Sequence, residues 1–219
     1  NFILQVDMNK AYNNVEWSFI IWVMRWFRFQ EEFCDLFFRC YSSPCLSVSL
    51  MGKCFGFIKL VWGVHQGYPL SPTLFNLAQY ALSRNLNCGL EEGEMNPFCG
   101  RRGMESISHL MFTHDVLIFM NGRRRYLLHF LKILYNYGRL SGQGINVSKC
   151  HVFISKKCSY RRCKGIEDIL GYLYRKLPIF YLGVPFSCGY IKKQHFEGIL
   201  DRLLGRIIRW KNMLLSFGG

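Results

Sequence analysis

Two acidic residues lie at the ends of short apolar runs, where their carboxylates could bind a divalent metal ion. Asp7 follows the apolar run at 2–6, and Asp115 lies beside His114 at a polar tip between two further apolar runs. Short apolar runs are typical of buried strands, and a polar tip between two of them is typical of a hairpin. Considered alone, each acidic residue is more often a structural residue of a strand end or a turn.

A polar loop with the sequence HQGYPLSP, at 65–72, leads into a long helical pattern. A helix N-terminus after a glycine-containing loop offers backbone N–H groups to a phosphate or a template backbone. Gln66 could also hydrogen-bond a base or a sugar. A plain turn followed by a helix cap explains Gly67 and Pro69 equally well. That alternative does not explain why the loop lies between the two acidic strand ends.

The elements that must position these residues are mixed strands and helices. No steady alternation of strand, helix and strand is present, so we predict an α+β domain with an antiparallel sheet. The apolar periodicity predicts helices at 15–27, 31–41, 71–90, 123–140, 161–170 and 194–215. It predicts strands at 2–6, 46–50, 55–60, 107–112, 116–120, 152–155 and 179–182, the second and third of which form a hairpin.

The composition excludes a disordered chain and indicates an anionic partner. Half of the 219 residues are hydrophobic, which is far above the level of disordered proteins. The 28 basic residues against 14 acidic ones leave a net charge of +14. Nucleic acid is the usual partner of such a surplus, and a membrane surface is the alternative. No apolar stretch approaches the length of a membrane span.

The spacing of the cysteines indicates the redox compartment of the protein, and the start of the chain indicates whether it is a fragment. None of the ten cysteines forms a C-x2-C pair, so we expect reduced structural cysteines in an intracellular protein and no zinc site. The chain begins with a strand-like run at Asn1, without an initiator methionine or a secretory signal. We therefore expect it to be a piece of a longer protein.

Six segments in order resemble the motifs of reverse transcriptases from non-LTR, long-interspersed-element retrotransposons, the plant type in particular. Each segment is weakly specific, but their order and spacing together are strongly so, and they cover essentially the whole chain. The segments are DMNKAY with VEW at 7–17, HQGYPLSPTLFNLAQYALSRNL at 65–86, ISHLMFTHDVLIF at 107–119, SGQGINVSKC at 141–150, YLGVPF at 181–186 and DRLLGRIIRWKNMLLSFGG at 201–219.

This resemblance implies the palm of a right-hand polymerase at 1–190 and the start of a thumb at 191–219, with the fingers largely missing. It implies RNA-directed DNA synthesis, a nucleotidyltransferase reaction on an RNA template, a DNA primer and a dNTP. It also implies a Mg²⁺ cofactor, with Mn²⁺ as an alternative, and a nuclear location. A basic helix at 192–211 would lie against the duplex phosphates.

The resemblance also assigns roles to single residues. Asp7 and Asp115 would bind the metal ions, Lys149 would lie near the triphosphate as a proton donor, and Tyr12 would be the aromatic gate below the sugar. Gln66 and Gly67 would line the template and nucleotide pocket. The primer grip would consist of Tyr181, Leu182 and Gly183.

The chain departs from the family pattern at the most important position. His114 replaces the first aspartate of the catalytic pair, and imidazole is a poor ligand for Mg²⁺. Further departures are Asn13, Asn14, His65 and Tyr68, and each aspartate loss needs only one nucleotide change. We therefore predict a catalytically impaired copy.

Three alternatives remain open at the level of the sequence. The first is a nucleic-acid-binding remnant without catalysis, which the net charge and Trp210 allow. The second is a reading frame without a function, which Lys59 and His129 among apolar neighbours would support. A maturase-like splicing helper ranks last, because no maturase domain follows.

Overall fold

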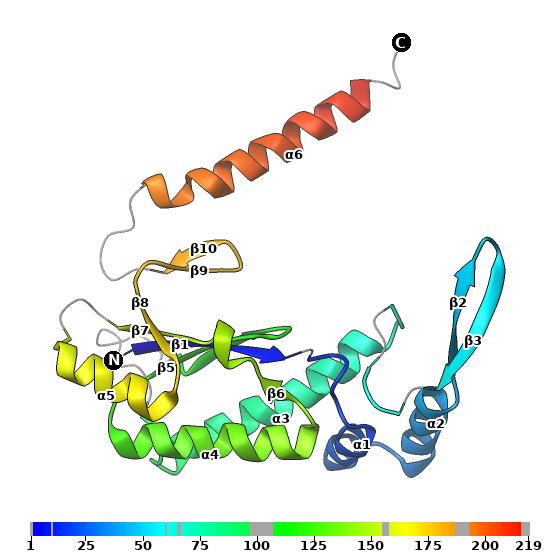
Figure 1. Cartoon of the computed structure of the whole chain (residues 1–219), viewed down its shortest axis with the longest axis horizontal. Coiled ribbons are helices and arrows are strands. Elements are labelled where there is room, and N and C mark those ends of the chain that lie inside the picture. The colour runs from blue at the N-terminus through cyan, green and yellow to red at the C-terminus, as the bar shows by residue number, and fades with distance from the viewer. Residues whose placement is uncertain are drawn as a thin grey trace.

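The computed structural model describes residues 2–9, 11–59, 61–64, 67–96, 107–154, 158–186 and 193–215, with side chains as far as 211. Its centre is a sheet with the strand order β4-β5-β1-β7-β8 (Figure 1). These strands are β1 Phe2–Asn9, β4 His109–Phe112, β5 Asp115–Met120, β7 His151–Ile154 and β8 Leu173–Lys176. The short β6, Gly144–Ile145, also pairs with β1.

The strand β1 lies in the middle of the sheet and sets its register. It is antiparallel to β5, with Asp7 opposite Asp115, and antiparallel to β7 on its other side. Leu4 and Val6 are fully buried because alternate side chains of a strand point to one face. The same alternation carries Asp7 to the opposite face, at the end of the strand. The hydrophobic pattern therefore fixes which face carries the acidic residues.

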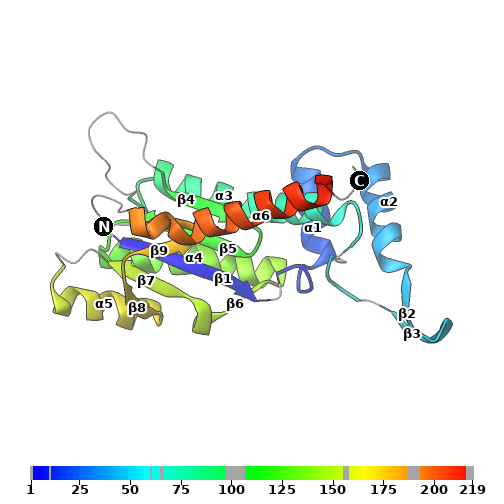
Figure 2. The same cartoon turned by 90° about the horizontal axis from the view of Figure 1, so that it is seen from above.

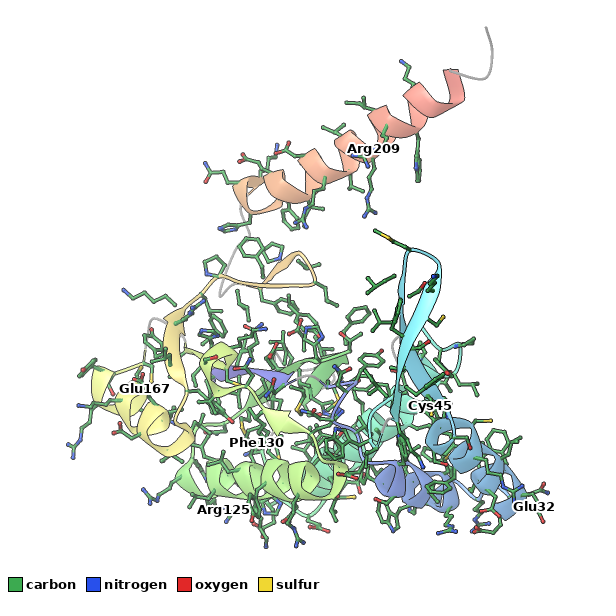
Figure 3. The ribbon with its side chains drawn as sticks, turned by 45° about the vertical axis from the view of Figure 1, so that its right-hand side comes forward. Glu32, Cys45, Arg125, Phe130, Glu167 and Arg209 are labelled. Carbon is green, nitrogen blue, oxygen red and sulfur yellow. The ribbon has the colours of Figure 1, made fainter. Side chains whose placement is uncertain are left out.

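Two long helices cover one face of the sheet, α3 Ser71–Glu91 and α4 Arg124–Ser141 (Figure 1). Pro72 lies in the first turn of α3, where its missing N–H costs nothing. Both helices bury one apolar face, and Figure 3 shows Phe130 of α4 among the side chains beneath the sheet. The helix α5, Tyr160–Leu170, extends this layer, and α1 Trp17–Trp26 and α2 Glu31–Ser42 flank it.

A small hairpin covers part of the other face. It consists of β9 Ile179–Tyr181 and β10 Val184–Phe186. A second apolar cluster forms beneath it from Leu117, Phe153, Ile179 and Tyr181. The hairpin therefore lies over the same face that carries Asp7.

Two elements extend away from this body. The hairpin of β2 Cys45–Leu50 and β3 Lys53–Lys59 is exposed along its whole length. After the 3-10 turn Lys193–Phe196, the helix α6 Glu197–Leu215 lies apart from the sheet, and every described side chain from 201 to 211 is exposed (Figures 1 and 2). Figure 3 shows Arg209 on α6, away from the core.

The observed elements match the expected α+β architecture, but the short β6 and the strand β8 were not predicted. The pairing of β8 with β7 is parallel within an otherwise antiparallel sheet. The two residues proposed as misfits in the core are not buried. Lys59 is exposed on β3, and His129 is half-buried with its Nδ1 3.9 Å from a carboxylate oxygen of Glu94.

Candidate active site

The structure brings the predicted metal ligands together at one end of the sheet. Asp7 lies near the end of β1, just before the buried Met8, and Asp115 begins β5 directly opposite it. His114 occupies the turn before Asp115, and one ligand atom from each of the three residues lies within 4.8 Å of the others. The side chain of Asp7 is 10% exposed, against 31% for Asp115 and 52% for His114. The cluster therefore has a buried side and an open side.

The backbone of the turn at 113–114 is held from two directions. The amide N–H of Met8 donates a hydrogen bond of 3.0 Å to the carbonyl oxygen of His114. The side-chain amide of Gln79, on α3, donates to the carbonyl oxygen of Thr113. Thr113 has a φ of 50°, a left-handed conformation that is rare for a β-branched residue. These contacts position His114 and Asp115 independently of their side chains.

Lys149 is the nearest cation to the acidic pair among the described residues. Its Nζ lies 4.0 Å from Oδ1 of Asp7, and the side chain is 66% exposed. The short 3-10 turn Val147–Lys149 that carries it is tied to β1, because Asn146 N–H donates to the Asp7 carbonyl oxygen at 2.9 Å. Lys149 can therefore reach a negatively charged group above the site while it stays near Asp7.

The thiol of Cys150 lies beneath the same carboxylate. Burial raises the pKa of Cys150 to about 11, and this outweighs a hydrogen bond with the Asp7 backbone, which lowers it. The nearby Asp7 carboxylate adds to the increase. Cys150 therefore remains a neutral thiol at neutral pH, and it acts as an apolar floor below the acidic pair.

Tyr12 lies in the turn that follows β1 and stacks on Phe75 of α3. The ring centroids are 4.2 Å apart, with an angle of 16° between the planes. The turn is held by Gln143, whose side-chain amide donates to the carbonyl oxygen of Ala11 at 2.9 Å. Gln143 is itself held by the hydroxyl of Tyr137, which donates to its Oε1 at 2.7 Å. This buried clamp connects α4 to the turn carrying Tyr12.

The loop that precedes α3 is anchored to the same turn. Val64 N–H donates to the carbonyl oxygen of Tyr12 at 2.7 Å, and the indole N–H of Trp17 donates to Gly63 at 2.8 Å. Gly67 has a φ of 96°, a conformation that favours glycine. Gln66 lies outside the described residues, so its predicted role stays a prediction.

The hairpin β9–β10 places the expected primer grip beside the acidic pair. The hydroxyl of Tyr181 donates to the carbonyl oxygen of Asp115 at 3.3 Å. Leu182 and Gly183 form the turn of the hairpin, with φ values of 51° and 84°. The turn faces α6, because a Cβ on Gly183 would lie 3.6 Å from the guanidinium of Arg202. The structure thus connects Tyr181 directly to β5.

The chemistry of the three donors fits a divalent cation. Two carboxylates on facing strand ends supply oxygen ligands, which Mg²⁺ and Mn²⁺ both accept. The third donor is an imidazole, which suits softer metal ions better than Mg²⁺. Asp7, Asp115 and His114 can therefore hold one divalent cation, and the donor set is weaker for Mg²⁺ than three carboxylates would be.

Comparison with known families decides what this site belongs to. The profile of the reverse transcriptase (RNA-dependent DNA polymerase) family matches residues 1–186. The chain belongs to the reverse transcriptase family. Divalent metal ions serve this family generally, which agrees with the cluster at the strand ends. The match includes the strand, turn and hairpin segments that carry Asp7, Tyr12, Asp115 and Tyr181.

Individual relatives agree with this assignment. The chain is 28% identical over 192 residues to the retrovirus-related Pol polyprotein from type-1 retrotransposable element R2 of Popillia japonica, covering 84% of the chain and 30% of that protein. With the family match, this relative confirms the predicted reverse transcriptase domain of a non-LTR retrotransposon. The chain spans about a third of the length of that relative.

Two solved structures share the fold. One is apo telomerase from Candida tropicalis, truncated from its C-terminal domain, with a TM-score of 0.55 and 15% identity over 73% of this chain and 31% of that one. The other is telomerase from Candida albicans in complex with a TWJ fragment of telomeric RNA, with a TM-score of 0.54 and 14% identity over 84% of this chain and 29% of that one. These similarities confirm the palm-like α+β fold of the reverse transcriptase. No described helix is long and apolar enough to cross a membrane.

Sequence reasoning missed three residues that support the site. Gln79, Tyr137 and Gln143 were given no role. Gln79 and Gln143 each hold a turn of the site through a hydrogen bond to a backbone carbonyl, and Tyr137 holds Gln143. The available signal was a polar residue at a position whose helical neighbours are apolar, as for Gln79. For Gln143 no local signal exists, because its partner Ala11 lies 132 residues away.

Proposed function

We propose that this site supports template-directed DNA synthesis on RNA, and that His114 impairs the reaction in this chain. The observation that carries the proposal is the juxtaposition of Asp7, His114 and Asp115 at the facing ends of β1 and β5. In the reaction, the 3′-hydroxyl oxygen of the primer bonds to the α-phosphorus of a dNTP. The bond to the β-phosphate breaks, pyrophosphate leaves and the hydroxyl proton passes to solvent.

The residues around the cluster suit the parts of this reaction. Asp7 and Asp115 would hold a divalent cation, which would supply activation of the attacking oxygen and neutralisation of charge on the leaving one. Lys149 would contact the triphosphate and supply a proton to the leaving pyrophosphate. Tyr12 would lie below the sugar, with its ring fixed by Phe75. Tyr181, Leu182 and Gly183 would place the primer end, and Gln66 and Gly67 would line the nucleotide pocket.

The expected impairment follows from the donor set. An imidazole offers a single neutral nitrogen to a metal ion, whereas the carboxylate it replaces offers two charged oxygens. Losing this charge weakens the stabilisation of the transition state by several kcal/mol, and each 1.4 kcal/mol is about tenfold in rate. Mn²⁺ tolerates imidazole better than Mg²⁺ does, so any remaining synthesis should favour Mn²⁺.

Primer extension tests this proposal. The native chain and a His114→Asp variant would be assayed on an RNA template with a DNA primer, in Mg²⁺ and in Mn²⁺. We expect extension by the variant at a rate at least about 100-fold above that of the native chain. A control that adds Asp115→Asn to the variant should abolish the gain. Equal rates for the native chain and the variant in both metals would refute the impairment.

A second candidate function is binding of nucleic acid without synthesis. The net charge of +14 and the exposed, basic α6 favour it. Binding of an RNA–DNA duplex should then weaken steeply with salt, in the native chain and in the His114→Asp variant alike. Binding without extension by either protein would favour this candidate. The contiguous buried core, and the positions of Lys59 and His129, weigh against a chain without a folded role.

The domain boundary, the identity of the metal and the origin of the chain are further proposals that follow from the family resemblance. We infer a palm at 1–190 and a thumb that begins within 191–219, Mg²⁺ as the native cofactor and an origin among plant elements acting in the nucleus. The separation of α6 from the sheet supports the boundary (Figure 1). Limited proteolysis with mass spectrometry would test it, and cleavage confined to sites before residue 180 would contradict it.

A further inference from the structure

A serine and a histidine meet on the edge of the sheet, away from the acidic cluster. Ser83 lies on α3, and His109 begins the edge strand β4. The hydroxyl oxygen of Ser83 lies 2.7 Å from Nε2 of His109. On the other side of the ring, Nδ1 lies 2.8 Å from the hydroxyl oxygen of Ser108. Both nitrogens of this imidazole are therefore engaged by hydroxyl groups.

The surroundings of the ring favour one protonation state. Burial lowers the pKa of His109, so the imidazole is neutral at neutral pH. A neutral ring carries one N–H, and donation from Nδ1 to Ser108 leaves Nε2 as an acceptor for the hydroxyl of Ser83. We assign the tautomer from this network. The arrangement is that of a nucleophile, a base and a group that orients the base.

The pair opens onto a cavity of about 330 Å³, which Ser83 and His109 both line. Asn76 and Tyr80 lie on the same face of α3 as Ser83, because residues three and seven apart in a helix share a face. The amide of Asn76 can donate a hydrogen bond to an oxygen of a molecule in the cavity. None of the roles proposed for the metal site involves these residues.

We propose that Ser83 and His109 form a second reactive site, which accepts acyl groups from activated carboxylic esters. The oxygen of Ser83 bonds to the carbonyl carbon while its proton passes to Nε2 of His109. The bond from that carbon to the alcohol oxygen then breaks, and the alcohol leaves with the proton. Ser108 acts as a positioning residue for His109. This proposal is independent of DNA synthesis at the acidic cluster.

Covalent labelling of the native chain tests the proposal without any substitution. The chain would be incubated with p-nitrophenyl acetate, and separately with an alkyl fluorophosphonate, whose P–F bond breaks as the serine oxygen binds phosphorus. We expect one adduct per chain, which peptide mass spectrometry assigns to Ser83. No adduct, or labelling distributed over other residues, would overturn the proposal.

Variants then separate reactivity from a structural hydrogen bond. Ser83→Ala should abolish the adduct, and His109→Gln should slow its formation at least about 100-fold. Ser108→Ala should slow labelling, and Ser108→Thr, which keeps the hydroxyl, should restore it. Ser148→Ala is the matched control, because Ser148 is exposed and its hydroxyl donates to Asn146 rather than to an imidazole. If His109→Gln labels as fast as the native chain at the same melting temperature, the pair is only structural.

Discussion

Two glycines that end helices offer a test of how α4 supports the site. Gly142 follows α4 with a φ of 75°, and Gly171 follows α5 with a φ of 71°. Both adopt the left-handed conformation that ends helices at glycine. Their surroundings differ, because a Cβ on Gly171 would meet nothing within 4 Å. A Cβ on Gly142 would fall inside contact distance of the Asn14 carbonyl oxygen and 2.9 Å from Cγ of Glu16.

The expected cost of each alanine substitution follows from these surroundings. The left-handed conformation costs a residue with a Cβ about 1–2 kcal/mol, and this applies to Gly142→Ala and Gly171→Ala equally. Gly142→Ala adds a steric clash with backbone, and forcing extra atoms into a packed site costs about 1–3 kcal/mol. The difference in unfolding free energy between the two variants therefore measures how much the close approach of the end of α4 to the turn that carries Tyr12 costs when a Cβ is added.

Thermal and urea unfolding of both variants measures this difference. In a chain of this size 1 kcal/mol shifts the melting temperature by about 2–4 °C, so the two variants should differ by roughly 2–12 °C. Gly142→Ala should also slow extension by the His114→Asp protein, because the turn carrying Tyr12 must move. Equal melting temperatures for the two variants would refute the packing described for Gly142.

Three further predictions concern the same end of the sheet. Gln143→Leu should lower the free energy of unfolding by about 2–4 kcal/mol, because it leaves the Ala11 carbonyl unpaired and the Tyr137 hydroxyl without its nearer acceptor. Urea denaturation measures this loss, and an unchanged free energy of unfolding would contradict the role given to the Gln143 hydrogen bonds. Asp7→Asn should weaken Mn²⁺ binding by tenfold or more in a titration followed by electron paramagnetic resonance, whereas unchanged affinity would place the metal elsewhere. Cys150 should resist iodoacetamide at pH 8 until the chain unfolds. Because the pKa of Cys150 is higher in the folded chain than in the unfolded chain, the thiol contributes to stability below pH 9, and this contribution is lost as the pH rises from 9 to about 11. Cys150→Ala should therefore make the free energy of unfolding depend less on pH in this range.

The sequence predicted the elements whose signals are local. The helix expected at 71–90 is observed at Ser71–Glu91, because Pro72 and the apolar spacing mark it without help from the rest of the chain. The strand β8 was missed because most of its residues are exposed, and it becomes a strand only by pairing with β7. Pairing partners that lie far apart in sequence leave no periodic signal in a segment of four residues.

The site shows the same division between local and distant information. Asp7 and Asp115 were predicted as metal ligands from the family resemblance of the segments that carry them, and the register of β1 and β5 places them opposite each other. The residues that hold their turns were not predicted, because Gln79 and Gln143 act on backbone carbonyls that any residue would supply. A side chain that hydrogen-bonds the backbone of a distant segment can do so whatever residue lies there, so the sequence of that segment does not reveal the contact.

The separation between the residues that hold the turn and the residues that would bind the metal explains how His114 can impair the chemistry without disturbing the fold. The turn is held through the carbonyl oxygens of Thr113 and His114, and the imidazole itself is 52% exposed. Exposed substitutions usually change stability by less than about 0.5 kcal/mol, and a bound cation would offset the repulsion that a third carboxylate adds beside Asp7 and Asp115. With Mn²⁺ present, His114→Asp should therefore leave the melting temperature nearly unchanged while it raises the rate of extension. Equal stability with unequal rates would locate the loss in the metal ligands, because a folding defect would change both.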